Sequence, residues 1–233
     1  MGAISTALQS CHTRMRGACK QAGRDLSSVT LLAVSKTFSD SAIREAWLAG
    51  QRCFGESYLQ EALGKIQSLA DLSIEWHFIG PIQSNKTRSI ATHFSWVHGI
   101  ESEKIAQRLS AQRPIELAPL QVCLQVNVSG ETSKHGLSPD DALALAHRVA
   151  ALPNLTLRGF MTIPEATTDA ALLRQRFRTL AALLLSAREE KLEVDTLSMG
   201  MSGDMETAIA EGATIVRVGT AIFGARTYPQ ESS

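Results

Sequence analysis

A single lysine follows the first strongly apolar segment of the chain, where it could react with a carbonyl group. Residues 29–34 are almost continuously apolar, which is typical of a strand buried on both faces of a parallel sheet, and Lys36 comes just after them. Partial burial at the end of such a strand favours the neutral, nucleophilic form of a lysine amine. The alternative is a lysine whose charged end extends into water, and position alone does not decide between the two.

Two glycine-containing loops near the end of the chain have the composition of a phosphate-binding site. Residues 198–204 read Ser-Met-Gly-Met-Ser-Gly-Asp, and residues 217–220 read Arg-Val-Gly-Thr. Glycine lets backbone N–H groups approach phosphate oxygens, and the N-terminus of a following helix supplies positive potential. Either loop alone could be an ordinary turn. Their joint occurrence after the last two predicted strands favours a phosphate site.

Arg217 and His77 are polar residues inside predicted apolar strands. Arg217 shares a strand face with Ile215, so its guanidinium needs a buried ligand or an ion pair with an Asp or Glu. His77 lies between two aromatic residues, and we interpret it as a hydrogen-bonded residue of the core or rim rather than a catalyst. The chain has no HExxH motif, no Cys/His set with zinc spacing, no Walker A sequence and no GxGxxG. The sequence therefore predicts neither a metal site nor a nucleotide site.

Eight apolar strands alternate with helices along the chain. The expected strands are residues 29–34, 52–54, 74–79, 94–97, 120–126, 155–159, 196–199 and 214–218. The expected helices are residues 4–22, 40–49, 56–69, 102–111, 138–152, 169–191 and 204–211, with a short helix within residues 81–91. This alternation predicts an α/β fold, a single (β/α)8 barrel domain over residues 1–233, with an open doubly wound sheet as the alternative. The N-terminal helix would replace the helix missing after the last strand, and the C-terminal ends of the strands would carry the site.

Charge and composition exclude several classes of protein. Lys plus Arg and Asp plus Glu each number 23, so the formal net charge is zero, which argues against a broad nucleic-acid surface. No apolar run approaches the roughly 20 residues of a membrane-spanning helix, and the N-terminus has no apolar segment of a secretory signal. The four cysteines form no CxxC pair and are expected to be free thiols. We therefore expect a cytoplasmic protein that binds neither nucleic acid nor membrane.

The segments around these residues resemble a known family. They are Ala33-Val-Ser-Lys36, Phe54-Gly-Glu-Ser-Tyr58 with Gln60-Glu61, His77-Phe-Ile-Gly-Pro-Ile-Gln-Ser-Asn-Lys86, Gly159-Phe-Met-Thr-Ile163, Leu197-Ser-Met-Gly-Met-Ser202 with Asp204-Met205, and Arg217-Val-Gly-Thr-Ala-Ile-Phe-Gly224. Through them the chain is similar, in register over essentially its whole length, to the pyridoxal phosphate homeostasis proteins (the YggS/PROSC family). One departure is Ser57, where the family usually has Asn; serine still donates and accepts a hydrogen bond.

The resemblance implies a barrel similar to the N-terminal domain of alanine racemase, with pyridoxal 5′-phosphate (PLP) as the cofactor. By the same resemblance, Lys36 carries PLP as a Schiff base. Ser202, Gly219 and Thr220 match positions that hold the phosphate, and Arg217 matches the arginine that faces the pyridine nitrogen. A guanidinium there disfavours protonation of the ring, and an unprotonated ring is a poor electron sink.

The implied function is non-catalytic. The protein would hold PLP, buffer it or deliver it to PLP-dependent apo-enzymes, and so act in vitamin B6 homeostasis, without catalytic residues and as a monomer. One alternative is a PLP-dependent enzyme such as an amino-acid racemase, which needs a second acid/base opposite the lysine. The chain has two tyrosines, Tyr58 and Tyr228, and we interpret Tyr58 as a packing or rim residue. Another alternative is a barrel enzyme that forms a Schiff base with a phosphorylated sugar.

Overall fold

The centre of the molecule is a closed barrel of eight parallel strands, in a computed structural model that describes residues 2–130 and 135–225. Neighbouring strands pair in chain order, and β8 pairs with β1 to close the ring. The strands are β1 Thr30–Val34, β2 Cys53–Glu56, β3 Glu75–Phe78, β4 Trp96–Ile100, β5 Leu120–Gln125, β6 Leu155–Met161, β7 Thr196–Ser198 and β8 Ile215–Val218. The predicted (β/α)8 barrel is confirmed, and the open sheet is wrong.

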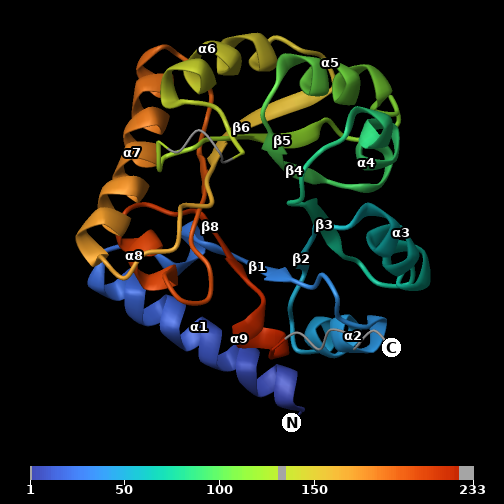
Figure 1. The fold of residues 1–233 in the computed structure, drawn as a ribbon. Coiled ribbons are helices and arrows are strands. Elements are labelled where there is room, and N and C mark those ends of the chain that lie inside the picture. The colour runs from blue at the N-terminus through green and yellow to red at the C-terminus, as the bar shows by residue number, and fades with distance from the viewer. Residues whose placement is uncertain (1, 131–134, 226–233) are drawn as a thin grey trace, which may run out of the picture.

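Helices form a ring around the barrel, as Figure 1 shows. In the described ranges they are α1 Ala3–Gln21, α2 Asp40–Leu48, α3 Leu59–Ser68, α4 Thr87–His93, α5 Glu103–Gln112, α6 Pro139–Ala150, α7 Ala170–Glu189, α8 Met205–Ala210 and α9 Thr220–Phe223, with short 3-10 turns η1 Leu26–Ser28 and η2 Ser84–Lys86. Hydroxyls of Ser39, Ser102 and Ser138 accept backbone N–H bonds at the starts of α2, α5 and α6, as expected for N-caps. None of the helices in these ranges combines the length and apolar character that a membrane crossing requires.

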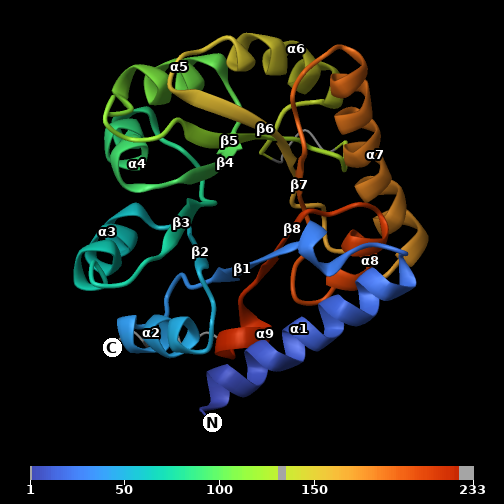
Figure 2. The ribbon, with the colours of Figure 1, turned by 180° about the vertical axis from the view of Figure 1, so that it is seen from behind.

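The N-terminal helix closes the ring of helices beside the last strand. Helix α1 lies alongside α8 and α9, and the two opposite views in Figures 1 and 2 agree on this. The expectation that no helix follows the last strand is wrong, because α9 does, but α9 has only four residues. Helix α1 therefore packs between α8 and α2, beside the short α9, where a full-length eighth helix would otherwise lie, as predicted.

A small apolar cluster fills part of the barrel interior. It comprises Leu32, Trp96, Cys123, Met161 and Ile215, all 8% exposed or less. These side chains come from five strands around the ring and pack against one another, so they lie inside the barrel. A larger cluster joins the outer faces of the strands to the helices. Side chains alternate between the two faces of a strand, so Arg217 points inward as Ile215 does.

Several predicted element boundaries are wrong by two residues or more, and the errors around β2 and β4 affect residues inside the barrel. Strand β2 extends to Glu56, whereas the sequence predicted that a helix begins there; α3 begins only at Leu59. Strand β4 begins at Trp96 rather than at Phe94 and continues to Ile100. The backbone N–H of Phe94 instead bonds to the carbonyl of Ile90 and closes α4. Phe94 looked like a strand residue because it is apolar and aromatic, but its side chain is buried at the end of a helix.

Candidate functional site

A cavity of about 330 Å³ opens at the carboxyl ends of the strands, the mouth at which barrel enzymes act. The five residues selected from the sequence all line it: Lys36, Ser202, Arg217, Gly219 and Thr220. The other lining residues are Val34, Ser57, Ile79, Ile163, Met201 and Gly203. The volume falls within the range of about 300–1,000 Å³ that is usual for small-molecule sites. The structure thus brings together one amine, one guanidinium and several hydroxyl and N–H donors.

Lys36 lies in a short loop with unusual backbone geometry. Its neighbour Thr37 has a φ of +70°, which a β-branched residue rarely adopts. The Thr37 N–H donates to Oε1 of Glu61 at 2.6 Å, and this bond helps to hold the loop. The Lys36 side chain is half-buried, and its Nζ lies over the ring of Tyr58, 5.9 Å from the ring centre. Tyr58 is 53% exposed, which confirms the prediction of a rim residue, whereas Tyr228 lies outside the described residues.

A buried ion pair lies beneath this loop. Lys65 Nζ donates to Glu56 Oε1 at 2.8 Å, to Glu61 Oε1 at 2.5 Å and to the backbone carbonyl of Ser35 at 2.8 Å. The Ser35 hydroxyl donates to the same Glu56 oxygen at 2.6 Å. Burial raises the pKa of the Glu56 carboxyl, and the Lys65 ammonium opposes that shift. This Lys65 cluster (Ser35, Glu56, Glu61 and Lys65) holds the residues on both sides of Lys36 and so fixes where its side chain leaves β1.

Arg217 enters the barrel interior from β8 and is only 4% exposed. Its Nη1 donates to the carbonyl and the hydroxyl of Ser198 at 2.6 and 2.7 Å, and its Nη2 donates to the carbonyl of Thr162 at 2.8 Å. These three bonds leave two of its five N–H groups without an acceptor among the described residues. The alternative of an ion pair with an Asp or Glu is wrong for these residues, since all three acceptors are neutral. Burial lowers the pKa of Arg217 to about 10, so the guanidinium stays charged near neutral pH.

The two predicted phosphate loops meet at the rim of the cavity. The Thr220 hydroxyl lies 3.2 Å from the Ser202 hydroxyl, and the backbone N–H of Ala221 lies 3.4 Å from the same oxygen. Gly219 joins β8 to α9, and a Cβ there would lie 3.2 Å from the carbonyl oxygen of Val34. Glycine therefore lets this turn pack against the end of β1, beside the loop that carries Lys36. The result is a group of hydroxyl and backbone N–H donors from β7–α8 and β8–α9.

Helix α1 supports the first of these loops. Arg14 donates to the backbone carbonyl of Ser202 at 2.9 Å and forms an ion pair with Glu206 at 2.6 Å. The charge of Arg14 is paired with Glu206, and its contact with the loop is to a backbone carbonyl. Arg14 therefore holds the loop in place but adds no charged donor to the cavity rim. On the other side, Ser57 lines the cavity, and its carbonyl approaches Gly80 so closely that a Cβ there would lie 2.3 Å away.

Two histidines lie in the interior of the barrel. His77 is 1% exposed; its Nε2 lies 2.9 Å from Glu75 Oε1, and its Nδ1 lies 2.9 Å from Nε2 of His98. His98 Nδ1 lies 2.8 Å from the Ser198 hydroxyl. The interpretation of His77 as a hydrogen-bonded core residue is therefore confirmed. His98 was not predicted as a site residue, because the expected strand ended at residue 97; the alternation of Trp96 with His98 was the signal that could have revealed it.

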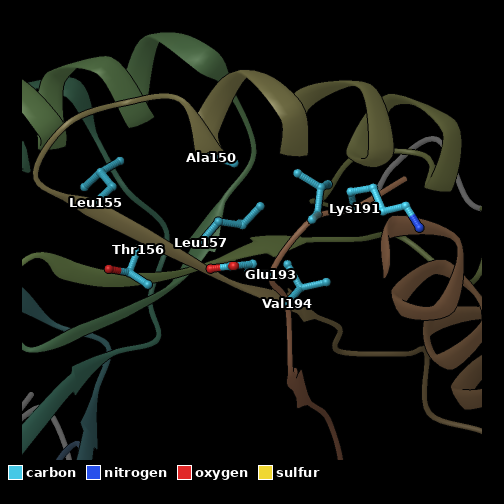
Figure 3. A pocket seen from close by; sticks show the side chains of 8 residues that line it. Ala150, Leu155, Thr156, Leu157, Lys191, Glu193 and Val194 are labelled. Carbon is cyan, nitrogen blue, oxygen red and sulfur yellow. The ribbon is translucent and has the colours of Figure 1, made fainter. Parts of the chain in front are cut away.

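A second cavity, of about 290 Å³, lies near the amino ends of β6 and β7 (Figure 3). It is lined by Ala150 at the end of α6, by residues 155–157 of β6 and by residues 191–194, which connect α7 to β7. None of the five candidate residues lines it. The chemistry predicted from the sequence therefore belongs to the opposite mouth of the barrel.

The barrel belongs to the class of the alanine racemase N-terminal domain. The family model of the alanine racemase N-terminal domain matches residues 13–227. The solved alanine racemase of Corynebacterium glutamicum, 18% identical, shares the fold with a TM-score of 0.67 over 99% of this chain and 62% of its own.

Relatives with higher sequence identity show which family within this class the chain belongs to. Pyridoxal phosphate homeostasis proteins of Pseudomonas aeruginosa and Vibrio cholerae are 59% and 52% identical, each over 100% of both chains. The solved structure of PipY of Synechococcus elongatus without PLP is 37% identical, with a TM-score of 0.85 over 95% of this chain and 100% of its own. The structure of PipY with PLP bound is 36% identical, with a TM-score of 0.83 over the same shares. The chain therefore belongs to the family of pyridoxal phosphate homeostasis proteins, as the resemblance in its sequence predicted.

The Lys65 cluster predicts a large effect of one substitution on stability. Lys65→Met leaves the Glu56 carboxylate buried without its partner, so we expect the free energy of unfolding to fall by about 3–5 kcal/mol in urea titrations. The double variant Glu56→Gln/Lys65→Met should recover part of this loss. Arg44→Met is the control, because it removes a pair with Asp71 in which both side chains are exposed. Equal losses from Lys65→Met and Arg44→Met would contradict the assigned role of the cluster.

Proposed function

We propose that this protein binds PLP at the carboxyl mouth of the barrel and holds it for buffering or delivery, without catalysing a reaction of amino acids. The observation that carries the proposal is one cavity lined by Lys36, Arg217 and the hydroxyls of Ser202 and Thr220. The names of the homeostasis-protein relatives and the PLP-bound structure of PipY support the same ligand. The acceptors of delivered cofactor would be PLP-dependent apo-enzymes.

The residues at the cavity fit the chemistry of each part of PLP. The neutral Lys36 amine would condense with the aldehyde: a C=N bond forms, the C=O bond breaks, and the oxygen leaves as water with the two hydrogens of the amine. Hydrolysis of the same bond returns the free aldehyde, so binding is reversible. The hydroxyls of Ser202 and Thr220 and the backbone at Gly219 are donors for the phosphate. Neutral donors of this kind can bind a phosphate without a charged side chain. The two unused N–H groups of Arg217 are donors for the pyridine nitrogen.

The same donor set argues against catalysis. A guanidinium only donates hydrogen bonds, so Arg217 keeps the ring nitrogen unprotonated, and an unprotonated ring stabilises a carbanion poorly. A racemase also needs a second acid/base on the far side of the substrate. Tyr58 does not supply one, since its ring lies against Lys36 Nζ and is therefore on the lysine's side of the site. These points favour the binding protein over the racemase-like alternative.

The Schiff base predicts a visible chromophore that depends on one lysine. PLP-loaded protein should show a visible band that borohydride fixes as a stable adduct on the peptide containing Lys36. Lys36→Ala should abolish both the band and the adduct, whereas Lys104→Ala, on the exposed face of α5, should leave them unchanged. Peptide mapping after reduction is the measurement. An adduct of equal occupancy at another lysine of the Lys36→Ala variant would rule out this assignment.

The phosphate donors predict discrimination between vitamers. Loss of one hydrogen bond to a charged group is worth roughly 1.5–3 kcal/mol, so Thr220→Val should raise the Kd for PLP about tenfold to a hundredfold. Pyridoxal, which lacks the phosphate, should bind the wild-type protein far more weakly than PLP does. Its Kd should be the same for the wild type and for Thr220→Val. Thr92→Val, at an exposed position of α4, is the matched control. Equal affinities for PLP and pyridoxal would show that these loops do not hold the phosphate.

The non-catalytic role predicts no turnover of free amino acids. PLP-loaded protein is incubated in heavy water with L- and D-alanine, serine and lysine. Deuterium at Cα is then measured by mass spectrometry, and inversion by chiral chromatography. We expect exchange no faster than that of free PLP with a lysine analogue. Sustained exchange on the order of 1 s⁻¹ or faster, an ordinary enzymatic rate, would instead establish an enzyme.

A further inference from the structure

A chain of hydrogen bonds crosses the barrel interior from one mouth to the other. Glu75, whose side chain is 46% exposed, is the first residue of β3 at the amino mouth, and its Oε1 lies 2.9 Å from His77 Nε2. His77 Nδ1 lies 2.9 Å from His98 Nε2 on β4, and His98 Nδ1 lies 2.8 Å from the Ser198 hydroxyl on β7. That hydroxyl is 2.7 Å from Arg217 Nη1 on β8, at the cavity of the carboxyl mouth. All members except Glu75 are 4% exposed or less.

The chemistry of the two ends fixes the direction of every bond. A guanidinium can only donate and an ionised carboxylate can only accept. The Ser198 hydroxyl therefore accepts from Arg217 and donates to His98 Nδ1. His98 Nε2–H then donates to His77 Nδ1, and His77 Nε2–H donates to Glu75. Both imidazoles are neutral in this arrangement, and burial lowers the pKa of each.

We propose that Glu75, His77, His98 and Ser198 are positioning residues that hold the Arg217 guanidinium so that its two unused N–H groups face the ligand. This inference rests on the proposed function, in which that ligand is the pyridine nitrogen of PLP. The Ser198 hydroxyl and carbonyl bind the two N–H groups of one Arg217 nitrogen. Rotation of the guanidinium plane would break both bonds. Polarisation of the Ser198 hydroxyl by His98 makes it a better acceptor for Arg217, because hydrogen bonds in a chain strengthen one another.

The chain also links Arg217 to the solvent at the opposite mouth. In the reversed direction, a bare His77 nitrogen would face the Glu75 carboxylate, so reversal requires an added proton between them. The groups around Glu75 oppose that proton: Cys53 Sγ lies 3.4 Å from its Oε1, and hydrogen bonds led by His77 lower the pKa of Glu75. Arg158, stacked on Trp96 at 4.9 Å, adds positive charge at the same mouth. The present direction is therefore the stable one near neutral pH.

Cys53, Glu75 and His77 also offer three atoms that could bind a metal ion, all within 4.8 Å of one another. The hydrogen bonds within this group account for it without an ion, because the Cys53 Sγ–H and the His77 Nε2–H both point to Glu75 Oε1. Burial raises the pKa of the Cys53 thiol to about 12, so it is a donor rather than a thiolate ligand.

The test breaks the chain at three distances from the cavity and follows the bound cofactor. Ser198→Ala and His98→Leu should each raise the Kd for PLP by about tenfold, and Glu75→Gln by about threefold. His98→Asn should lose less than His98→Leu, because its amide oxygen can still accept from Ser198. A displaced guanidinium no longer donates a hydrogen bond to the ring nitrogen of PLP, so that nitrogen binds a proton more readily. The pH midpoint of the ring-dependent change in the visible band should therefore rise in all variants that break the chain.

Matched controls separate this role from general destabilisation. Ser110→Ala removes a buried hydroxyl outside the chain, and Glu193→Gln removes an exposed carboxylate just before β7, at the same mouth as Glu75. Both should leave the Kd and the pH midpoint unchanged. Glu75→Gln is the decisive variant, because Glu75 lies at the rim and does not line the cavity. If it matches Glu193→Gln in both readouts while wild type binds PLP, the inference is wrong; if wild type shows no PLP band, the proposed function fails as well.

Discussion

The burial of one guanidinium is the constraint around which the barrel interior is arranged. Removing an ion from water costs several kcal/mol unless hydrogen bonds replace the lost solvation, and Arg217 is 4% exposed. Its acceptors are the Ser198 and Thr162 carbonyls and the Ser198 hydroxyl, and no described carboxylate pairs with it. Neutral acceptors satisfy the N–H groups but do not cancel the charge. The positive potential therefore remains available to a lone pair or an anion at the carboxyl mouth.

Closure of the barrel sets the relation between Arg217 and Lys36. Strands β1 and β8 pair with Leu32 opposite Arg217 and Ala33 opposite Val218. Lys36 therefore lies further toward the mouth than Arg217, and the two basic side chains approach the cavity from different depths. Lys36 reaches it from a loop held by the Lys65 cluster, whereas Arg217 reaches it from inside the barrel. This difference in depth suits an elongated ligand with a carbonyl group near the rim and a hydrogen-bond acceptor deeper in the barrel.

The sequence predicted the barrel and the place of the site from local patterns. Apolar segments alternating with helices define the strands, and Lys36 and the loops at residues 198–204 and 217–220 were selected because they lie at strand ends. The resemblance to the family then singled out Ser202, Gly219 and Thr220 within those loops. The Lys65 cluster and His98 were missed for two reasons. An error of two residues at the end of β2 placed Glu56 in a helix, and an error of three residues at the end of β4 left His98 outside a strand. In addition, partners such as His98 and Ser198 are 100 residues apart, and no local pattern encodes that contact.

Exposure changes along the cavity in a way that suits a carrier. Arg217 is buried, Lys36 is half-buried, and Thr220 and Gly203 at the phosphate rim are exposed. In the proposed complex, water can therefore reach the phosphate and the Schiff base, while the ring nitrogen lies in the dry part of the barrel. Hydrolysis of the C=N bond needs water, and release of the cofactor requires the phosphate donors to exchange it for solvent. A site that is rigid at the ring and open at the phosphate meets both needs, because the fixed guanidinium sets the orientation and the neutral rim lets the ligand leave.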